Sequence, residues 1–251
     1  MLKIRVIPTL LWNGNALVKG KGFDSWRTVG SALQAVKVFN LRGVDELVLL
    51  DIRATAEGRA PDFSMVDELA DWCFVPLSVG GGVSSAQDVA KLLRAGADKV
   101  VITTAATKSD VIPSVVRKFG SQCVVAGIDV RRHQNGACEV FTHSGATATG
   151  RDPVDYAREL ERLGAGEILL ASIERDGMMC GYDVALTRAV SDAVSVPVIA
   201  SGGAGCYQDM ADVLREGGAS AVAAASIFQF TEQTPREAKQ FLKEKGFAVR
   251  L

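Results

Sequence analysis

The sequence predicts a (β/α)8 barrel, or TIM barrel, formed as one domain by the whole 251-residue chain. Two observations predict it. Apolar runs of strand length alternate with amphipathic stretches of helix length along the chain, and the second half of the chain repeats the first. Continuous apolar strands alternating with helices indicate a parallel sheet that is buried on both faces. Eight such units fit a closed barrel. A doubly wound open sheet is the alternative fold.

The predicted strands are eight short runs rich in Val, Ile, Leu and Ala, the composition expected of buried strands. In chain order they are KIRVIPTL (3–10), DELVLLDI (45–52), VPLSVGGG (75–82), DKVVITTA (98–105), CVVAGIDV (123–130), EILLASIE (167–174), VPVIASGG (196–203) and SAVAAASIF (220–228). The first of these ends in a Gly/Asn turn, with Leu11 as its last strand position.

Between the strands, apolar residues recur at helical spacing. Clear examples are SSAQDVAKLLRAGA (84–97), DPVDYARELERLGA (152–165), DVALTRAVSDAV (183–194) and CYQDMADVLREGGA (206–219). One long insert, residues 131–150, contains no such pattern. We expect it to form a hairpin across the top of the barrel.

The repeat relates residues 75–105 to residues 196–226 with an offset of 121 positions. Gly81 and Gly82 then match Gly202 and Gly203. A repeat of half the chain predicts two homologous half-barrels, about 1–120 and 121–251, related by a pseudo-twofold axis.

Composition excludes several classes of protein. A net charge of −1 and a pI of about 6.2 give no electrostatic reason to expect nucleic acid or a membrane surface as partner. The N-terminus lacks a signal-peptide pattern, and no apolar run reaches the roughly 18 residues that span a bilayer. Five scattered cysteines without a CxxC pair, and only two histidines, His133 and His143, predict free thiols in the cytoplasm and neither a metal nor a cofactor.

The two glycine pairs predict where chemistry takes place. Each pair ends a strand and precedes a helix, and each is followed one unit later by a small polar strand end, Thr103–Thr104 or Ala225–Ser226. Glycine lets an anion approach backbone N–H groups, and the helix N-terminus favours negative charge. We therefore expect a phosphorylated small molecule with a phosphate at each end. The alternative is that the glycines only permit tight turns.

Under the same repeat, the strand ending at Leu11 aligns with the strand ending at Asp129. Both positions should lie at the mouth of the barrel between the two glycine sites. A pair of carboxylates there could act as general acid and general base. Leu11 cannot move a proton, so half of such a pair is absent.

These residues, together with ALVKGKGF, RAGADKVVI, FGSQCVVAGID and GAGEILLASIERDG, resemble the cyclase subunit of imidazole glycerol phosphate synthase, the HisF-type barrel, over the whole chain. In that family a partner glutaminase, HisH, releases ammonia. The ammonia crosses the barrel to a bis-phosphorylated ribulosyl-imidazole substrate, and two aspartates catalyse the reaction. Their positions correspond to Leu11 and Asp129 here.

The resemblance implies roles for further residues. Lys19, in a flexible loop that closes over the substrate, and Asp176 would join Asp129 in catalysis. The substrate pocket would include Asp51, Arg53, Ser144 and Ser201. The chain departs from the family pattern at Thr103, Arg53, Met178 and Gln229. We expect Arg53 either to pair with Asp51 or to meet a substrate anion, and Trp26 to serve as a packing or loop anchor.

At the opposite end of the barrel, the family has a ring of four charges that gates ammonia entry. Its equivalents are Arg5, Glu46, Lys99 and Glu167, and the resemblance places Asp98 and Gln122 against the glutaminase. The alternative is a salt-bridge cluster that only plugs this end.

An intact entrance with an altered chemical end favours a specialised relative of the cyclase. We expect a subunit that forms a heterodimer with a HisH-like glutaminase. The chain is similar to HisF-like paralogues associated with the amidination of surface-polysaccharide sugars, and this resemblance implies that it delivers ammonia to a separate amidotransferase that makes acetamidino sugars. The alternatives are a working cyclase of histidine biosynthesis and a non-catalytic activator of the glutaminase.

Overall fold

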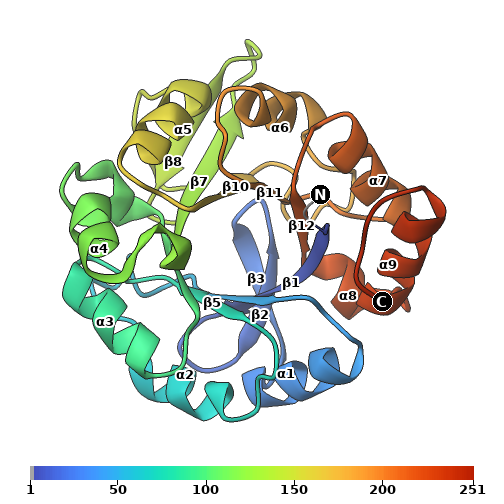
Figure 1. The fold of residues 1–251 in the computed structure, drawn as a ribbon, viewed down its shortest axis with the longest axis horizontal. Coiled ribbons are helices and arrows are strands. Elements are labelled where there is room, and N and C mark those ends of the chain that lie inside the picture. Colours follow the sequence, from blue (N-terminus) through green and yellow to red (C-terminus); the bar gives the residue numbers. More distant parts are fainter. Residues whose placement is uncertain (1–2) are drawn as a thin grey trace.

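The computed structural model describes residues 3–251 and contains a closed barrel of eight parallel strands (Figure 1). The barrel strands are β1 (Arg5–Trp12), β4 (Leu47–Asp51), β5 (Leu77–Gly80), β6 (Lys99–Ile102), β7 (Val124–Arg132), β10 (Glu167–Ser172), β11 (Val198–Ser201) and β12 (Ala221–Ala224). β12 pairs with β1 and β7 pairs with β10, so the eight barrel strands form a closed ring. Every predicted run overlaps one of these strands, and β1 and β7 each extend two residues beyond the predicted run. The predicted fold class is therefore confirmed, and the open sheet is excluded.

Helices surround the barrel on all sides (Figure 1). They are α1 (Ala32–Leu41), α2 (Phe63–Ala70), α3 (Ala86–Arg94), α4 (Val111–Phe119), α5 (Pro153–Arg162), α6 (Val184–Ser191), α7 (Tyr207–Arg215), the short α8 (Ser226–Phe230) and α9 (Pro235–Glu244), with 3-10 turns at Thr104–Thr107 and Ser121–Cys123. Two helices that the repeat aligns, α3 and α7, begin alike. Asp88 and Asp209 each occupy the third helical position and accept hydrogen bonds from the backbone before the helix.

The barrel interior is filled by one apolar cluster. It comprises Ile7, Val48, Val101, Val125, Leu169, Ile199, Ala221 and Ala223, none more than 5% exposed. Because side chains alternate along each strand, the intervening residues, such as Val6 and Leu10, face the helices and form a second core layer. The interior is therefore lined by apolar side chains along the barrel axis.

Two hairpins extend the barrel at its C-terminal end. β8 (Cys138–Thr142) and β9 (Thr147–Ala148) continue antiparallel from β7, which confirms the hairpin predicted for residues 131–150. β2 (Leu17–Lys21) and β3 (Asp24–Gly30) form the second hairpin, and β2 pairs with β1 through Leu11 and Trp12. Lys19 was expected in a flexible loop, whereas it lies within β2, because residues 17–21 are held between β1 and β3.

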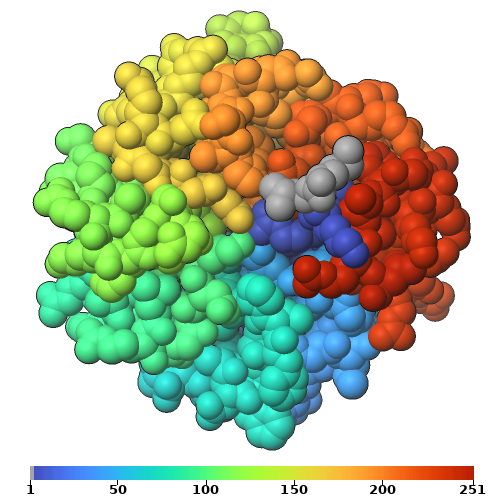
Figure 2. Space-filling view, in the orientation of Figure 1, coloured from blue at the N-terminus to red at the C-terminus, as the bar shows by residue number. Residues whose placement is uncertain are grey.

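Residues 4 and 249, near the two ends of the described chain, meet at the end of the barrel where the strands begin. Ile4 forms a parallel bridge with Val249, and its N–H donates a hydrogen bond of 2.7 Å to the carbonyl of Ala248. Figure 2 shows this face, with the first and last segments side by side near its centre. Among the described helices, none is long and apolar enough to cross a membrane.

Candidate active site at the mouth of the barrel

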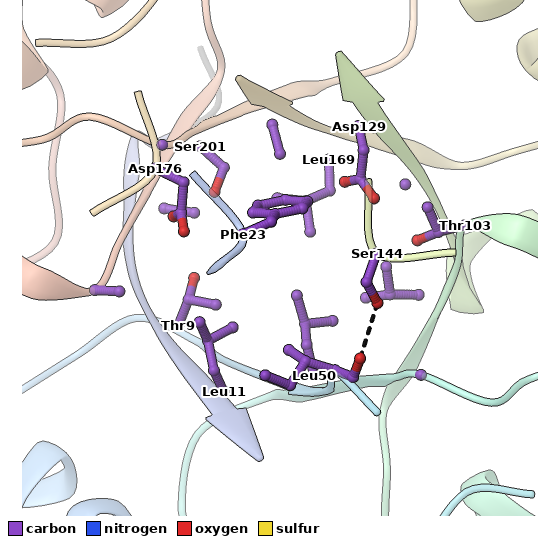
Figure 3. A pocket seen from close by; sticks show the side chains of 18 of the residues that line it. Thr9, Leu11, Phe23, Leu50, Thr103, Asp129, Ser144, Leu169, Asp176 and Ser201 are labelled. Carbon is purple, nitrogen blue, oxygen red and sulfur yellow. Dashed lines mark hydrogen bonds between the residues drawn. The ribbon is translucent and has the colours of Figure 1, made fainter. Parts of the chain in front are cut away.

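A pocket opens at the C-terminal ends of the barrel strands (Figure 3). It is lined by both predicted glycine pairs and by the predicted residues Leu11, Asp51, Thr103, Thr104, Asp129, Ser144, Asp176, Ser201, Ala225 and Ser226. The fold thus brings together residues from both halves of the sequence in one cavity. Of the residues predicted for catalysis, phosphate binding or the substrate pocket, Lys19 and Arg53 do not line it.

The two glycine pairs lie on opposite sides of this pocket, because β5 and β11 are four strands apart around the ring of eight. Gly81 and Gly203 have φ angles of 97° and 108°. A Cβ atom at Gly81 would come within 2.1 Å of the carbonyl oxygen of Asp51, and one at Gly203 within 2.1 Å of that of Gly181. Tight turns therefore require glycine here, as the alternative interpretation held. The same turns also border the pocket, where their backbone can approach a ligand.

Asp129 and Asp176 supply the acidic groups of the pocket. Burial, and then the charge of Asp176, raise the pKa of Asp129 to about 7. Burial also raises the pKa of Asp176, against the opposing effect of Lys19. A carboxyl group with a pKa near neutrality can both accept and return a proton at physiological pH. Asp129 is therefore suited to acid–base work.

Lys19 stands behind the pocket wall. It is 2% exposed, and its Nζ donates a hydrogen bond of 2.9 Å to the carbonyl of Thr9. Burial lowers the pKa of the Lys19 ammonium to about 7, while the charge of Asp176 acts in the opposite direction. Lys19 and Asp176 thus each favour the charged form of the other, although Lys19 does not line the pocket.

Leu11 faces the pocket from β1, four strands away from β7 and Asp129 (Figure 3). It is 8% exposed, and Leu50 lines the same cavity. Phe23 and Trp26 of the β2–β3 hairpin also line the pocket, and the Phe23 ring lies across it in Figure 3. Trp26 was predicted to be a packing or loop anchor. It lies in β3, its ring packs against Gly20 of β2, and it also lines the cavity. The position of Leu11 thus contributes no proton-transfer group to the pocket.

The four charges at the opposite end of the barrel form a closed ring of alternating sign. Arg5 Nη1 lies 2.7 Å from Glu46 Oε2 and 3.1 Å from Glu167 Oε2. Lys99 Nζ lies 3.0 Å from Glu46 Oε2 and 3.1 Å from Glu167 Oε1. Burial, the largest influence, lowers the pKa of Arg5, but Glu167 and Glu46 together raise it above its ordinary value. The ring closes the base of the barrel beneath the apolar cluster.

The sequence was compared with models of known protein families. The model described as "Histidine biosynthesis protein" matches residues 5–234, which is most of the chain. The chain belongs to the histidine biosynthesis protein family. Enzymes of this family are isomerases and cyclases, and they bind phosphorylated substrates. A pocket with a glycine turn on each side agrees with such a substrate class.

One site residue of this family member was missed in the sequence. Both Nη atoms of Arg59 donate hydrogen bonds to the Asp51 carboxylate, at 2.6 Å and 2.8 Å. Arg53, predicted for the pocket, instead pairs with Glu57 at 2.9 Å, and its side chain is 61% exposed. The physical reason is that the loop after β4 folds back over the Asp51 carboxylate. Arg59, eight positions after Asp51, therefore reaches it, whereas the side chain of Arg53 points outward. A bidentate pair across a loop leaves no periodic signal in the sequence.

Ser144 connects two sides of the mouth. Its hydroxyl donates a hydrogen bond of 2.8 Å to the carbonyl of Ile52 beyond β4. The neighbouring His143 donates its backbone N–H to Thr104 Oγ1 at 3.0 Å. Both His143 and Ser144 have positive φ angles, 53° and 56°. The β8–β9 turn is therefore held over the pocket by contacts that sequence patterns do not reveal.

The remaining predicted residues lie outside the pocket. Asp98 and Gln122 are exposed. Asp98 accepts a hydrogen bond from Leu77 N–H, and Gln122 donates one to the Phe119 carbonyl. Met178 is 49% exposed and Gln229 lies in α8, and neither lines the cavity. Within residues 3–251, no group of three or more His, Cys, Asp or Glu side chains could hold a metal ion.

Proposed function

We propose that this chain is the ammonia-receiving subunit of a glutamine-dependent synthase, and that its pocket binds a ligand with a phosphate at each end. The observation that carries the proposal is the contrast between the two ends of the barrel. The four-charge ring is complete, whereas Leu11 replaces one of the two acid–base groups expected at the mouth. A HisH-like glutaminase docked on the ring face, near Asp98 and Gln122, would supply the ammonia.

The barrel interior supports this route. Between the ring and the pocket the inward-facing side chains are apolar, including Ile7, Val125 and Ile199. An unpaired ammonium ion is costly to bury in such surroundings, whereas neutral ammonia is not. The interior would therefore pass ammonia in its neutral, nucleophilic form. Opening the ring would require separating its ion pairs, which a docked partner could compensate.

At the mouth, the proposal assigns acid–base work to Asp129 alone. Its raised pKa lets it accept a proton from an attacking nitrogen and return it to a leaving group. The Leu11 side of the pocket offers no such group. We therefore assign the final transfer of ammonia to a separate amidotransferase. The resemblance to HisF-like paralogues, and no residue of the pocket, suggests its reaction, the conversion of an acetamido group of a surface-polysaccharide sugar into an acetamidino group.

A working cyclase of histidine biosynthesis is the second candidate. Both glycine pairs and Asp176 line the cavity, and a conduit alone would not need them. In that case Asp129 and Asp176 would share the two proton transfers. A subunit that only activates its glutaminase is the third candidate, and it would need neither the pocket nor an apolar interior.

The test is a cyclase assay with the bis-phosphorylated ribulosyl-imidazole substrate and an ammonium salt. It compares the wild type with Leu11→Asp and with Leu11→Asn, which has the shape of aspartate but cannot transfer its proton. We expect turnover in the aspartate variant alone. Appreciable wild-type turnover would favour the cyclase instead. An activator-only subunit would stimulate a HisH-type glutaminase, while neither the wild type nor either variant would show turnover.

A further inference from the structure

Each glycine pair is walled by the loop that follows the preceding barrel strand. A Cβ atom at Gly82 would lie 2.7 Å from the carbonyl of Arg59 and 2.8 Å from Ala54 Cβ, both in the loop after β4. On the opposite side, a Cβ atom at Gly203 would lie 2.1 Å from the carbonyl of Gly181 and 3.1 Å from Arg175 Cβ, both in the loop after β10. The shape of each glycine turn therefore depends on one loop.

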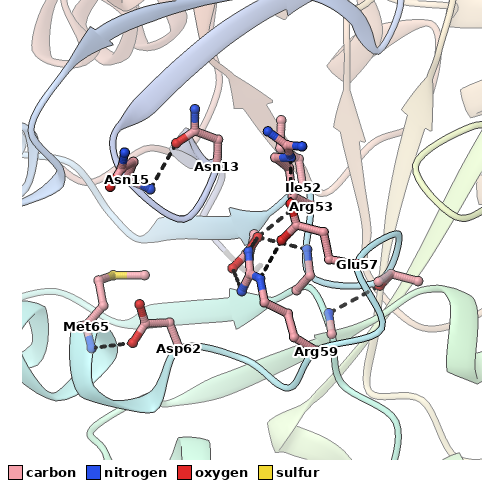
Figure 4. Close-up of polar contacts among 12 residues, drawn as sticks. Asn13, Asn15, Ile52, Arg53, Glu57, Arg59, Asp62 and Met65 are labelled. Carbon is pink, nitrogen blue, oxygen red and sulfur yellow. Dashed lines mark hydrogen bonds and ion pairs between the residues drawn. The ribbon is translucent and has the colours of Figure 1, made fainter.

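Arg59 closes the first loop. Its guanidinium bonds the Asp51 carboxylate twice, and its Nε bonds Glu57 at 2.7 Å (Figure 4). The Asp51 carboxylate also accepts the backbone N–H groups of Arg53 at 3.1 Å and of Ala54 at 3.0 Å. Because four donors already bond Asp51, and its side chain is 5% exposed, this carboxylate anchors the loop and is not free to bind a ligand.

The closed loop presents one hydroxyl to the glycine turn. Thr55 Oγ1 accepts a hydrogen bond of 3.3 Å from Gly82 N–H, and Thr55 lines the pocket. Its loop is folded back on itself by the bonds from Glu57 N–H to the Arg53 carbonyl and from Arg59 N–H to the Ala54 carbonyl. An anion at this turn would meet the Gly82 N–H and the Thr55 hydroxyl. The ion pair of Arg59 with Asp51 holds the loop that positions both groups.

Arg175 closes the second loop in a different manner. Its Nη1 donates to the carbonyls of Cys180, at 3.3 Å, and Gly181, at 3.0 Å. Gly181 N–H in turn donates to the Gly203 carbonyl at 2.8 Å. This closure relies on single bonds to neutral carbonyls, whereas the Arg59 closure is a bidentate ion pair, which is the stronger arrangement.

Neither guanidinium lines the pocket. We propose that Arg59 and Arg175 are positioning residues, and that each sets the affinity of one of the two phosphate sites by closing the loop that walls it. The inference rests on the proposed bis-phosphate pocket. It adds that the two sites are tuned independently, the Gly81–Gly82 site by an ion pair and the Gly202–Gly203 site by carbonyl bonds.

The test titrates the full-length chain, labelled with 15N-glycine, with inorganic phosphate and follows the four turn amides by NMR. In the wild type we expect all four amides to shift. Arg59→Lys keeps the positive charge but loses the bidentate ion pair with Asp51. It should raise the Kd for phosphate at Gly81 and Gly82 about tenfold, whereas the Kd at Gly202 and Gly203 should change by no more than about twofold. Arg175→Lys should produce the reverse selectivity with a smaller change.

Arg53→Lys is the matched control, because it alters an arginine of the first loop that bonds only Glu57 through its side chain, and it should change neither Kd. General destabilisation would weaken both sites alike, so equal effects at both glycine pairs, or no effect from either substitution, would overturn the inference. An absence of wild-type shifts would refute phosphate binding itself, and the inference with it. Shifts in the wild type with unselective variants would leave the proposed pocket standing.

Discussion

Replacing Glu46 with glutamine should destabilise the protein more than any surface charge substitution. The Glu46 side chain is 2% exposed and accepts bonds from Arg5 at 2.7 Å, Lys99 at 3.0 Å and Ser78 at 2.7 Å. Glutamine would leave two cations facing Glu167 alone, so the ring would carry a net charge of +1. Breaking a buried ion pair costs about 3–5 kcal/mol. Because the other ring side chains are 16–22% exposed, we expect the lower figure, about 3 kcal/mol.

The free energy of unfolding would be measured in urea, and the melting temperature should fall by about 6–12 °C. Asp192→Asn is the control, since its partner Arg188 is 53% exposed, and it should cost less than about 1 kcal/mol. Adding Lys99→Met to Glu46→Gln restores a neutral ring and should recover at least about 1 kcal/mol. The reasoning fails if the single variant costs less than the control, or if the double variant is no more stable than the single one.

Three further predictions concern the pocket and its walls, all measurable by urea unfolding. Thr9→Val should not lower stability, because the buried Thr9 Oγ1 has no hydrogen-bond partner within the described chain, whereas Ser78→Ala should cost about 1.5–3 kcal/mol through the lost bond to a buried carboxylate. A loss of 1 kcal/mol or more in Thr9→Val would show that its hydroxyl is bonded. Gly81→Ala should cost at least about 2 kcal/mol more than Gly58→Ala, since both have positive φ angles but only Gly81 would bring its Cβ against backbone; equal costs would contradict the clash. For Asp129, the folded pKa of about 7 exceeds the unfolded value of about 3.9, so the folded state binds more protons between these values and loses stability as pH rises through them. Asp129→Asn should therefore exceed the wild type in stability at pH 8, by at most about 4 kcal/mol, with a gain that shrinks toward pH 4; a pH-independent difference would contradict the raised pKa.

The barrel was predictable from the sequence because its cause is local and repeated. Runs such as residues 45–52 and 196–203 are apolar at nearly every position, as a strand buried on both faces must be. The repeat then placed Leu11 opposite Asp129 and the two glycine pairs opposite each other, and the strand order has the same arrangement. The membership of the ring came from the family resemblance, because nothing in the charge pattern alone brings Arg5 and Glu167 together.

The details of the mouth were not predictable, because they depend on how long segments fold back over the barrel. The β2–β3 hairpin carries Phe23 and Trp26 to the pocket and buries Lys19, which the family resemblance had placed in a loop. In the loop after β4, two arginines stand six positions apart, and only the geometry of the turn decides that Arg59 reaches Asp51. Such contacts have no periodicity and no short motif.

The bridge between Ile4 and Val249 makes the chain nearly circular, since its two ends are already joined by a hydrogen-bonded contact. Strand β12 meets β1 through the same parallel pairing that links every other neighbouring pair in the barrel. The contacts of the folded barrel therefore do not depend on which segment of the chain is synthesised first. A permuted gene that linked the present ends and opened the turn at Gly120, where the predicted halves meet, would encode the same barrel with the second half translated first.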